Sequence, residues 1–196
     1  MNKNILDFYL KAMELKNVER TGWREVGVSN VESVMDHVGG TIIFAMAINA
    51  EKNLNLDMEK VYEMIVIKEL KKVVSKKEDS IITGPTNSDT SEQLLNILTN
   101  NSELIDVYNE YNEGVSKEAK FASMICKLES DIQAKKYELD GEFTIENAKK
   151  DIENYPEDLK EKLTNIQNAS DGWLEYNKQY YDEMFKEFSS DIQKLN

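Results

Sequence analysis

Apolar residues recur every three or four positions along most of this chain, which is the spacing of one face of an α-helix. The clearest case is the segment 31–54, which we expect to form a helix capped by Ser29 or Asn30. A second helix is predicted from Asp57 to about Ser75. Its stretch 64–67 is apolar on nearly every side, as expected for a helix at the centre of a bundle.

The remaining helices are predicted from the same spacing and from their boundary residues. The whole chain has only 8 Gly and 2 Pro, which favours long helices over a many-stranded β fold. The polar segment 76–91 is expected to be a loop. The fold class is therefore all-α, with further helices at about 5–18, 92–99, 102–112, 116–139, 144–154, 156–167 and 172–195.

Apolar stripes and glycines give these helices further detail. In the first helix, Ile5, Tyr9, Ala12 and Met13 lie near helical spacing. In the helix 31–54, Gly39–Gly40 costs about 1 kcal/mol per glycine in helix propensity, which suggests a need for close packing or room. The last helix carries an aromatic and apolar stripe that indicates a core or dimer contact, formed by Trp173, Tyr176, Tyr180, Met184, Phe188 and Ile192.

The charge of the chain limits its partners. Of its 196 residues, 31% are charged, and the formal net charge is -13. Such a surface repels nucleic acid and anionic membranes, so we expect neither as a partner. A local basic patch could still bind one small anion.

Two features predict a cytoplasmic protein. Cys126 is the single cysteine, so no intramolecular disulfide can form, which fits a reducing compartment. The first twenty residues lack the apolar segment of a signal peptide, and the most apolar stretch, 41–50, is too short to span a bilayer.

Short motifs occur in a fixed order along the chain. They are Leu15-Lys16-Asn17-Val18-Glu19-Arg20-Thr21-Gly22-Trp23, Glu32-Ser33-Val34-Met35-Asp36-His37, Ser116-Lys117-Glu118-Ala119-Lys120, and Cys126-Lys127-Leu128-Glu129 followed by Gln133, Ala134 and Tyr137. In this order and spacing they resemble the HD-domain phosphohydrolases, in particular the 5'-deoxynucleotidase-like members. The resemblance covers about residues 5–140, and the final helix around Trp173 is similar to the family's closing helix. It implies an HD-domain-like helical bundle over residues 1–141 and a C-terminal helical extension over 142–196, packed into a single structural domain.

The resemblance also implies a divalent metal, held by a first His, a His-Asp pair and a distant Asp. His37 matches the first ligand. Lys68 and Glu69 stand where the His-Asp pair is expected, and Cys126 stands where the distant Asp is expected. Lys72 replaces a glutamate that helps to activate water in the nucleotidase-like members.

These substitutions argue against a metal site. A protonated lysine has three donors and no lone pair, so Lys68 cannot ligate a cation. We therefore expect no metal or other cofactor, and we interpret His37, Lys68, Glu69 and Cys126 as vestigial positions. The ammonium of Lys68 would instead neutralise a carboxylate such as Glu69, Asp36 or Glu129.

The predicted function is that of a catalytically inactive HD-domain homologue. Lys68 and Lys72 lie one helical turn apart and would form a cationic pocket floor for a small anionic ligand such as a nucleotide. Arg20, Trp23 and Glu32 are further candidates for ligand contacts. A protein partner is the other kind of ligand we expect, and the family resemblance implies a homo-oligomer, specifically a dimer.

The alternative is a divergent metal-dependent phosphohydrolase acting on (deoxy)nucleoside monophosphates. His37, Glu69 and Cys126 would then form a remodelled three-ligand site for a divalent metal, with Glu129 as a candidate base. A thiolate ligand favours zinc over manganese or magnesium.

Each candidate residue also has a purely structural interpretation. His37 could be hydrogen-bonded within the fold, and Cys126 could be a small buried side chain. Arg20 and Trp23 could anchor a loop, and the run 68–72 could be a solvated basic turn. If all of these held, the chain would be an interaction module whose pocket is filled with side chains.

Overall fold

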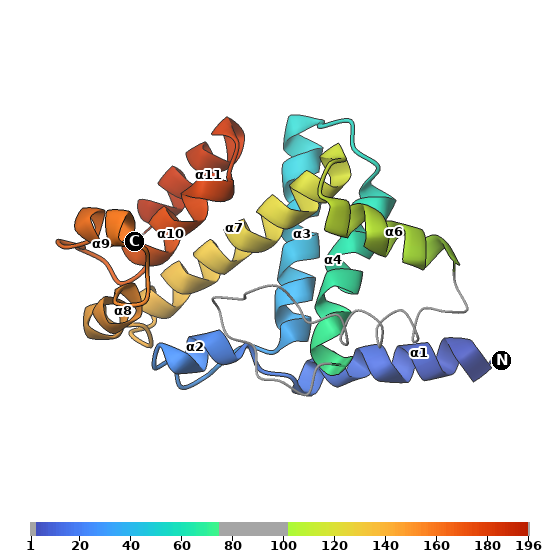
Figure 1. Cartoon of the computed structure of the whole chain (residues 1–196), viewed down its shortest axis with the longest axis horizontal. Helices are drawn as coiled ribbons and strands as arrows, with labels where there is room; N and C mark the ends of the chain where they lie inside the picture. The colour runs from blue at the N-terminus through green and yellow to red at the C-terminus, as the bar shows by residue number, and fades with distance from the viewer. Residues whose placement is uncertain (1–2, 75–101, 196) are drawn as a thin grey trace. The chain divides into compact units, whose positions relative to one another are not determined.

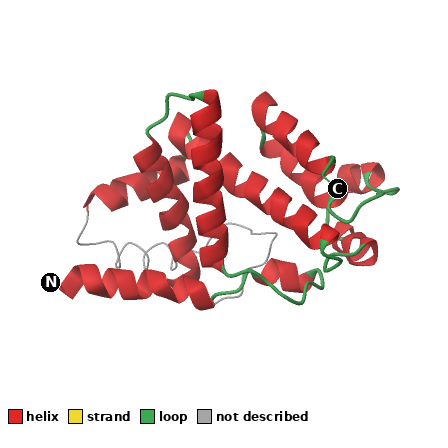
Figure 2. Cartoon of the chain, turned by 180° about the vertical axis from the view of Figure 1, so that it is seen from behind, coloured by secondary structure: helices red, strands yellow, loops and turns green. Residues whose placement is uncertain are grey.

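The computed structural model describes residues 3–74 and 102–195 (Figure 1). Within these ranges the regular structure is entirely helical, and the one β-bridge, between Glu19 and Ser33, is isolated (Figure 2). This confirms the predicted all-α class. The predicted loop 76–91 and helix 92–99 lie outside the described residues.

The described chain forms two compact units. The first comprises residues 1–21 and 32–126, and the second comprises residues 22–31 and 127–196. The long helix α7 (Lys117–Leu139) contributes its beginning to the first unit and its remainder to the second. The single domain with a boundary at residue 141 remains a prediction.

The first unit is built on two antiparallel helices, α3 (Val34–Lys52) and α4 (Met58–Val74), which pack side by side (Figures 1 and 2). Helix α6 (Ser102–Glu113) packs on α4, and α1 (Lys3–Met13) followed by the 3-10 helix η1 (Glu14–Asn17) packs on the same helix. As the apolar run 64–67 predicted, α4 lies in the core: Met64, Ile65 and Ile67 are at most 2% exposed.

The second unit contains the short helix α2 and the C-terminal helices. Their bounds are α2 Thr21–Glu25, α8 Ile145–Ile152, α9 Glu157–Lys162, α10 Asp171–Asn177, η2 Lys178–Tyr180 and α11 Glu183–Gln193. Its core includes Trp23, which stacks on Trp173 at 4.4 Å between ring centroids and meets Tyr137 edge-on at 5.3 Å. None of the described helices is long and apolar enough to cross a membrane.

The start of α3 corrects the predicted cap. Ser33, not Ser29 or Asn30, is the N-cap: its hydroxyl accepts from the Asp36 backbone, and its own backbone N–H donates to the Asp36 carboxylate. The chain stays extended up to Ser33 because it pairs with the segment around Glu19, where Val34 N–H donates to the carbonyl of Val18. Helix formation is therefore delayed by three to four residues relative to the prediction.

The last predicted helix is also interrupted. In place of one helix over 172–195, α10 and η2 end at Tyr180, and α11 starts after Tyr181, whose backbone is extended. Asp182 caps the new helix by accepting from the Phe185 backbone. The stripe predicted for this segment does not form one continuous face, because Trp173 is buried and Tyr180 is 46% exposed.

Candidate functional site

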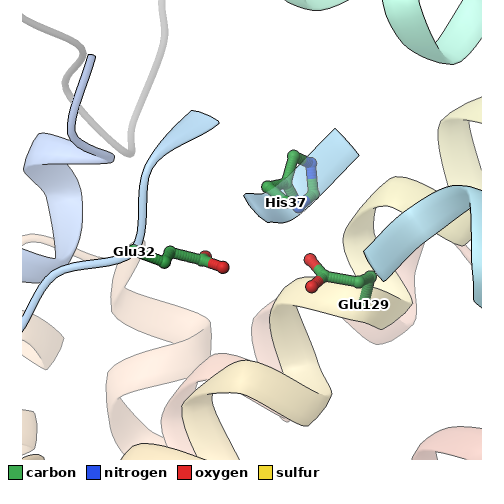
Figure 3. Close-up of side chains that lie close together, drawn as sticks. All are labelled: Glu32, His37 and Glu129. Carbon is green, nitrogen blue, oxygen red and sulfur yellow. The ribbon is translucent and has the colours of Figure 1, made fainter. Parts of the chain in front are cut away.

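His37 lies in the first turn of α3 and is only 1% exposed. Arg20 places one guanidinium nitrogen 3.0 Å from His37 Nδ1 and 3.0 Å from Glu32 Oε1. Figure 3 shows Glu32 extending from the segment that precedes α3, which carries His37. Arg20 and Glu32 come together because the Glu19–Ser33 bridge aligns their backbones, with Arg20 N–H donating to the Glu32 carbonyl.

The contact with Arg20 fixes the tautomer of His37. A guanidinium can only donate hydrogen bonds, so Nδ1 must accept and the ring hydrogen must reside on Nε2. This Nε2 lies 3.6 Å from Glu69 Oε1. A metal-bound histidine usually donates from its other ring nitrogen to an acceptor, whereas here that nitrogen receives a hydrogen bond.

Glu69 is the centre of the ionic cluster on α4. It is 1% exposed, and Lys68 Nζ lies 2.5 Å from its Oε1. Lys72 Nζ lies 3.0 Å from the other oxygen, Oε2, and places a second positive charge beside the carboxylate. The side chain of Lys68 is 29% exposed and that of Lys72 is 20% exposed, so both lysines are more accessible to solvent than the carboxylate they neutralise.

The pKa values in this cluster favour a fully ionised pair. Burial alone would raise the pKa of Glu69, but the charges of Lys68 and Lys72 hold it well below its usual range. Burial alone would lower the pKa of Lys68, but Cys126 and Glu69 outweigh that effect and raise it above its usual value. Lys68 therefore keeps its proton and remains a donor without a lone pair.

Cys126, at the end of the first unit, joins this cluster from α7. It is a free cysteine and 3% exposed. Burial raises the pKa of its thiol. The charge of the neighbouring Lys68 and a hydrogen bond with His37 lower this pKa by more, so the net shift is downward. The four positions that the family resemblance singled out are thus gathered in space from three helices.

Sequence reasoning missed one member of the cluster, Tyr111 on α6. Burial raises the pKa of its hydroxyl to about 12, opposed by the charge of Lys68 and a hydrogen bond with Ser123. Tyr111 belongs to none of the motifs. Its proximity depends on how α6 packs against α4, and no local pattern in the sequence reports that packing.

The remaining candidates are placed as follows. Trp23 is 1% exposed in the aromatic core of the second unit, which supports its interpretation as a packing residue. Glu129, also labelled in Figure 3, lies on α7 one turn beyond Cys126 and belongs to the second unit. Asp36, considered as a partner of Lys68, is engaged in the N-terminal cap of α3.

The residues of the cluster do not fit a divalent metal as they are arranged. His37, Glu69 and Cys126 are suitable ligand types for zinc. However, the ammonium of Lys68 is already bound to Glu69, and the Nε2 of His37 carries the hydrogen that ligation would have to displace. A divalent ion at this place would face a fixed positive charge at close range.

Comparisons with known proteins agree with the fold and the motifs. The HD domain family model matches residues 12–167. The 5'-deoxynucleotidase HDDC2 of Dictyostelium discoideum is 27% identical over 150 residues, covering 69% of this chain and 78% of the relative. Its namesake from Homo sapiens is 26% identical over 144 residues, covering 69% of each chain.

Two solved structures show the same fold over nearly the whole chain. A conserved hypothetical protein from Pyrococcus furiosus has a TM-score of 0.62 at 24% identity, covering 97% of this chain and 99% of that one. A predicted metal-dependent phosphohydrolase from Magnetospirillum magnetotacticum has a TM-score of 0.57 at 12% identity, covering 97% and 90%. With the family match over most of the chain, these findings confirm the resemblance seen in the motifs: this chain belongs to the HD-domain family and is similar to its 5'-deoxynucleotidase members.

Proposed function

We propose that this protein is a catalytically inactive HD-domain homologue that binds a small anion, such as a nucleotide, without a metal ion. The observation that carries the proposal is the ion pair between Lys68 Nζ and the buried carboxylate of Glu69. An ammonium takes the role of counter-ion to the carboxylate that, by family resemblance, would ligate the metal. No metal-bound hydroxide is then available to attack phosphorus.

The charges around His37 support anion binding. Arg20, Lys68 and Lys72 are cationic, and Glu32 and Glu69 are their carboxylate partners. These three cations lie in a chain whose formal net charge is -13. A phosphate dianion would find both charge and hydrogen-bond donors here, and guanidinium groups are especially suited to binding phosphate.

Thermal unfolding in the presence of EDTA tests anion binding. Inorganic phosphate or a deoxynucleoside monophosphate should raise the Tm of the wild-type chain, because a ligand that binds only the folded state stabilises it. Lys72→Met should remove this rise, while Lys120→Met, at an exposed position on α7, should keep it. If no phosphate compound raises Tm, the pocket is filled and the chain is an interaction module.

An activity assay tests the absence of catalysis. Deoxynucleoside monophosphates with added manganese, cobalt or zinc should give no turnover above the buffer rate. Turnover that is lost in Glu69→Gln would contradict the proposal directly, since a contaminating phosphatase would be unaffected by this substitution.

The alternative is a zinc-dependent phosphohydrolase, and one observation favours it. His37, Glu69 and Cys126 do meet in space, and they offer nitrogen, oxygen and sulfur to one ion. Lys68 would have to move aside, and Glu129 would be the candidate base. Elemental analysis separates the two proposals: this alternative requires about one zinc per chain that is lost in Cys126→Ser.

A further inference from the structure

The ion pair between Arg20 and Glu32 uses hydrogen-bond donors that an anion would need. One guanidinium nitrogen of Arg20, Nη1, lies 3.0 Å from Glu32 Oε1 and 3.0 Å from His37 Nδ1. This nitrogen carries two hydrogens, so the two contacts use both of them. An anion that accepts a hydrogen bond from Nη1 must therefore displace either Glu32 or His37.

Of these two partners, Glu32 is the one that can leave. The ring of His37 is 1% exposed, and its Nε2 lies 3.6 Å from Glu69 Oε1. Glu32 instead reaches Arg20 from the segment before α3 through a flexible side chain (Figure 3). The backbone of Glu32 is fixed separately, because its carbonyl accepts from the Arg20 N–H. The carboxylate can thus swing away while the backbone pairing stays intact.

Solvent can reach this ion pair. The side chain of Arg20 is 17% exposed and that of Glu32 is 9% exposed. An anion can therefore approach the guanidinium from outside without opening the core of the unit. A carboxylate and a phosphate are both oxyanions that accept from guanidinium groups, so one can replace the other without any new donor.

We propose that Glu32 is an internal competitor for the anion. Its carboxylate holds the place on Arg20 that an external oxyanion would take, and it has to leave before that oxyanion can bind. The contact is therefore autoinhibitory, and it weakens binding at the site instead of contributing a ligand contact. This inference rests on the proposed function, because it concerns the regulation of the same site.

The competition has a measurable cost. An anion that displaces Glu32 forms one charge-assisted hydrogen bond to Arg20 but breaks another, and the displaced carboxylate stays nearby and repels it. In Glu32→Gln the broken contact is only a neutral one and the repulsion is absent. We therefore expect Glu32→Gln to bind inorganic phosphate about tenfold more tightly than the wild type.

Calorimetric titration of the full chain with inorganic phosphate in EDTA measures this change. Glu59→Gln is the matched control, because it removes the same charge from an exposed position on α4. Its dissociation constant should stay within twofold of the wild-type value. Glu32→Asp separates contact from charge: the shorter carboxylate reaches Arg20 less well, so this variant should bind phosphate more tightly than the wild type although its charge is unchanged.

Chemical rescue tests the same place without phosphate. Glu32→Ala removes the carboxylate and leaves room for a small one, so millimolar formate should raise the Tm of this variant more than that of the wild type or of Glu59→Ala.

The outcomes distinguish the inference from the proposed function. If the wild type binds phosphate and Glu32→Gln binds it no more tightly, Glu32 is not a competitor, while the proposed function stands. If formate rescues Glu32→Ala but phosphate binds to no chain, the place on Arg20 accepts an external oxyanion, and the proposed phosphate binding is wrong. A failure of both formate and phosphate would overturn both.

Discussion

Glu69 shows how the neighbours of one buried carboxylate can determine its charge. A carboxylate that is 1% exposed would be several kcal/mol unfavourable without a partner. Lys68 and Lys72 supply two positive charges from the same helix, so the carboxylate stays ionised without a bound cation. The carboxylate is thus held by two charges that are covalently attached to α4.

Removing Lys68 should therefore destabilise the fold. We expect Lys68→Met to lower the free energy of unfolding by about 2–3 kcal/mol, because the buried carboxylate keeps only the more distant charge of Lys72. Urea denaturation measures this loss. Lys68→Arg, which retains the charge, should lose less.

A double-mutant cycle isolates the pair itself. The double variant Lys68→Met with Glu69→Gln should be less destabilised than the sum of the two single variants, with a coupling of about 1 kcal/mol or more. Additive effects would mean that Lys68 stabilises the fold through contacts other than the one with Glu69.

Asp131 gives a pH dependence that can be tested separately from the candidate site. It is 0% exposed on α7, where it accepts from Asn177 Nδ2 at 2.6 Å and from the Tyr181 hydroxyl at 2.7 Å. Burial raises the pKa of this carboxyl, whereas these hydrogen bonds and the charges of Lys178 and Lys127 lower it. Burial has the larger effect, and the resulting pKa is about 8.

The sign of the effect follows from this upward shift. The carboxyl has a pKa of about 4 in the unfolded chain, so between pH 4 and pH 8 the folded protein binds more protons than the unfolded chain. The contribution of the protonated Asp131 to the free energy of unfolding is complete below pH 4. It is lost as the pH rises towards 8, by at most about 1.4 kcal/mol per pH unit. Urea denaturation at several pH values should show this slope in the wild type and a reduced slope in Asp131→Asn. Identical slopes would mean that Asp131 is ionised throughout.

At the scale of the helices, the ends depend on contacts that a local pattern does not contain. The helix 116–139 was predicted to within one residue, because its boundaries are marked by Ser116 and Asp140–Gly141. The start of α3 was placed too early, because its pairing with the segment around Glu19 is a contact between distant parts of the chain. The break at Tyr181 was missed, since the aromatic spacing continues across it.

The same distinction explains what could be predicted of the site. Motif order located His37, Lys68, Glu69 and Cys126, and the structure brings them together. The chemistry of Lys68 follows from its residue type alone. Tyr111 and the tautomer of His37 could not be predicted, because they depend on helix packing and on one guanidinium orientation.

Gly39 provides a test of helix energetics within α3. The sequence suggested a need for room at this point, but a Cβ built on Gly39 meets no atom within 4 Å. Gly39→Ala should therefore raise the free energy of unfolding by about 0.5–1 kcal/mol, through improved helix propensity. Chemical denaturation measures the gain. Gly27→Ala is the contrasting variant and should be destabilising, because Gly27 has a φ of +89° and its Cβ would collide with Asn147.

At the scale of the whole molecule, the proposed loss of the metal predicts a fold that is stable without one. The cluster gathers residues from α3, α4 and α7, and in this proposal the ammonium of Lys68 links them in place of a metal ion. EDTA should therefore leave the Tm of the wild type unchanged.

The triple variant Lys68→His, Glu69→Asp and Cys126→Asp restores the four ligand types that the family resemblance implies. Manganese should raise the Tm of this variant, because a ligand bound only by the folded state stabilises that state. The double variant that keeps Lys68 should show no such rise, since the ammonium still occupies the carboxylate. A wild type destabilised by EDTA, or a double variant that responds to manganese as strongly as the triple one, would mean that Lys68 does not exclude the metal.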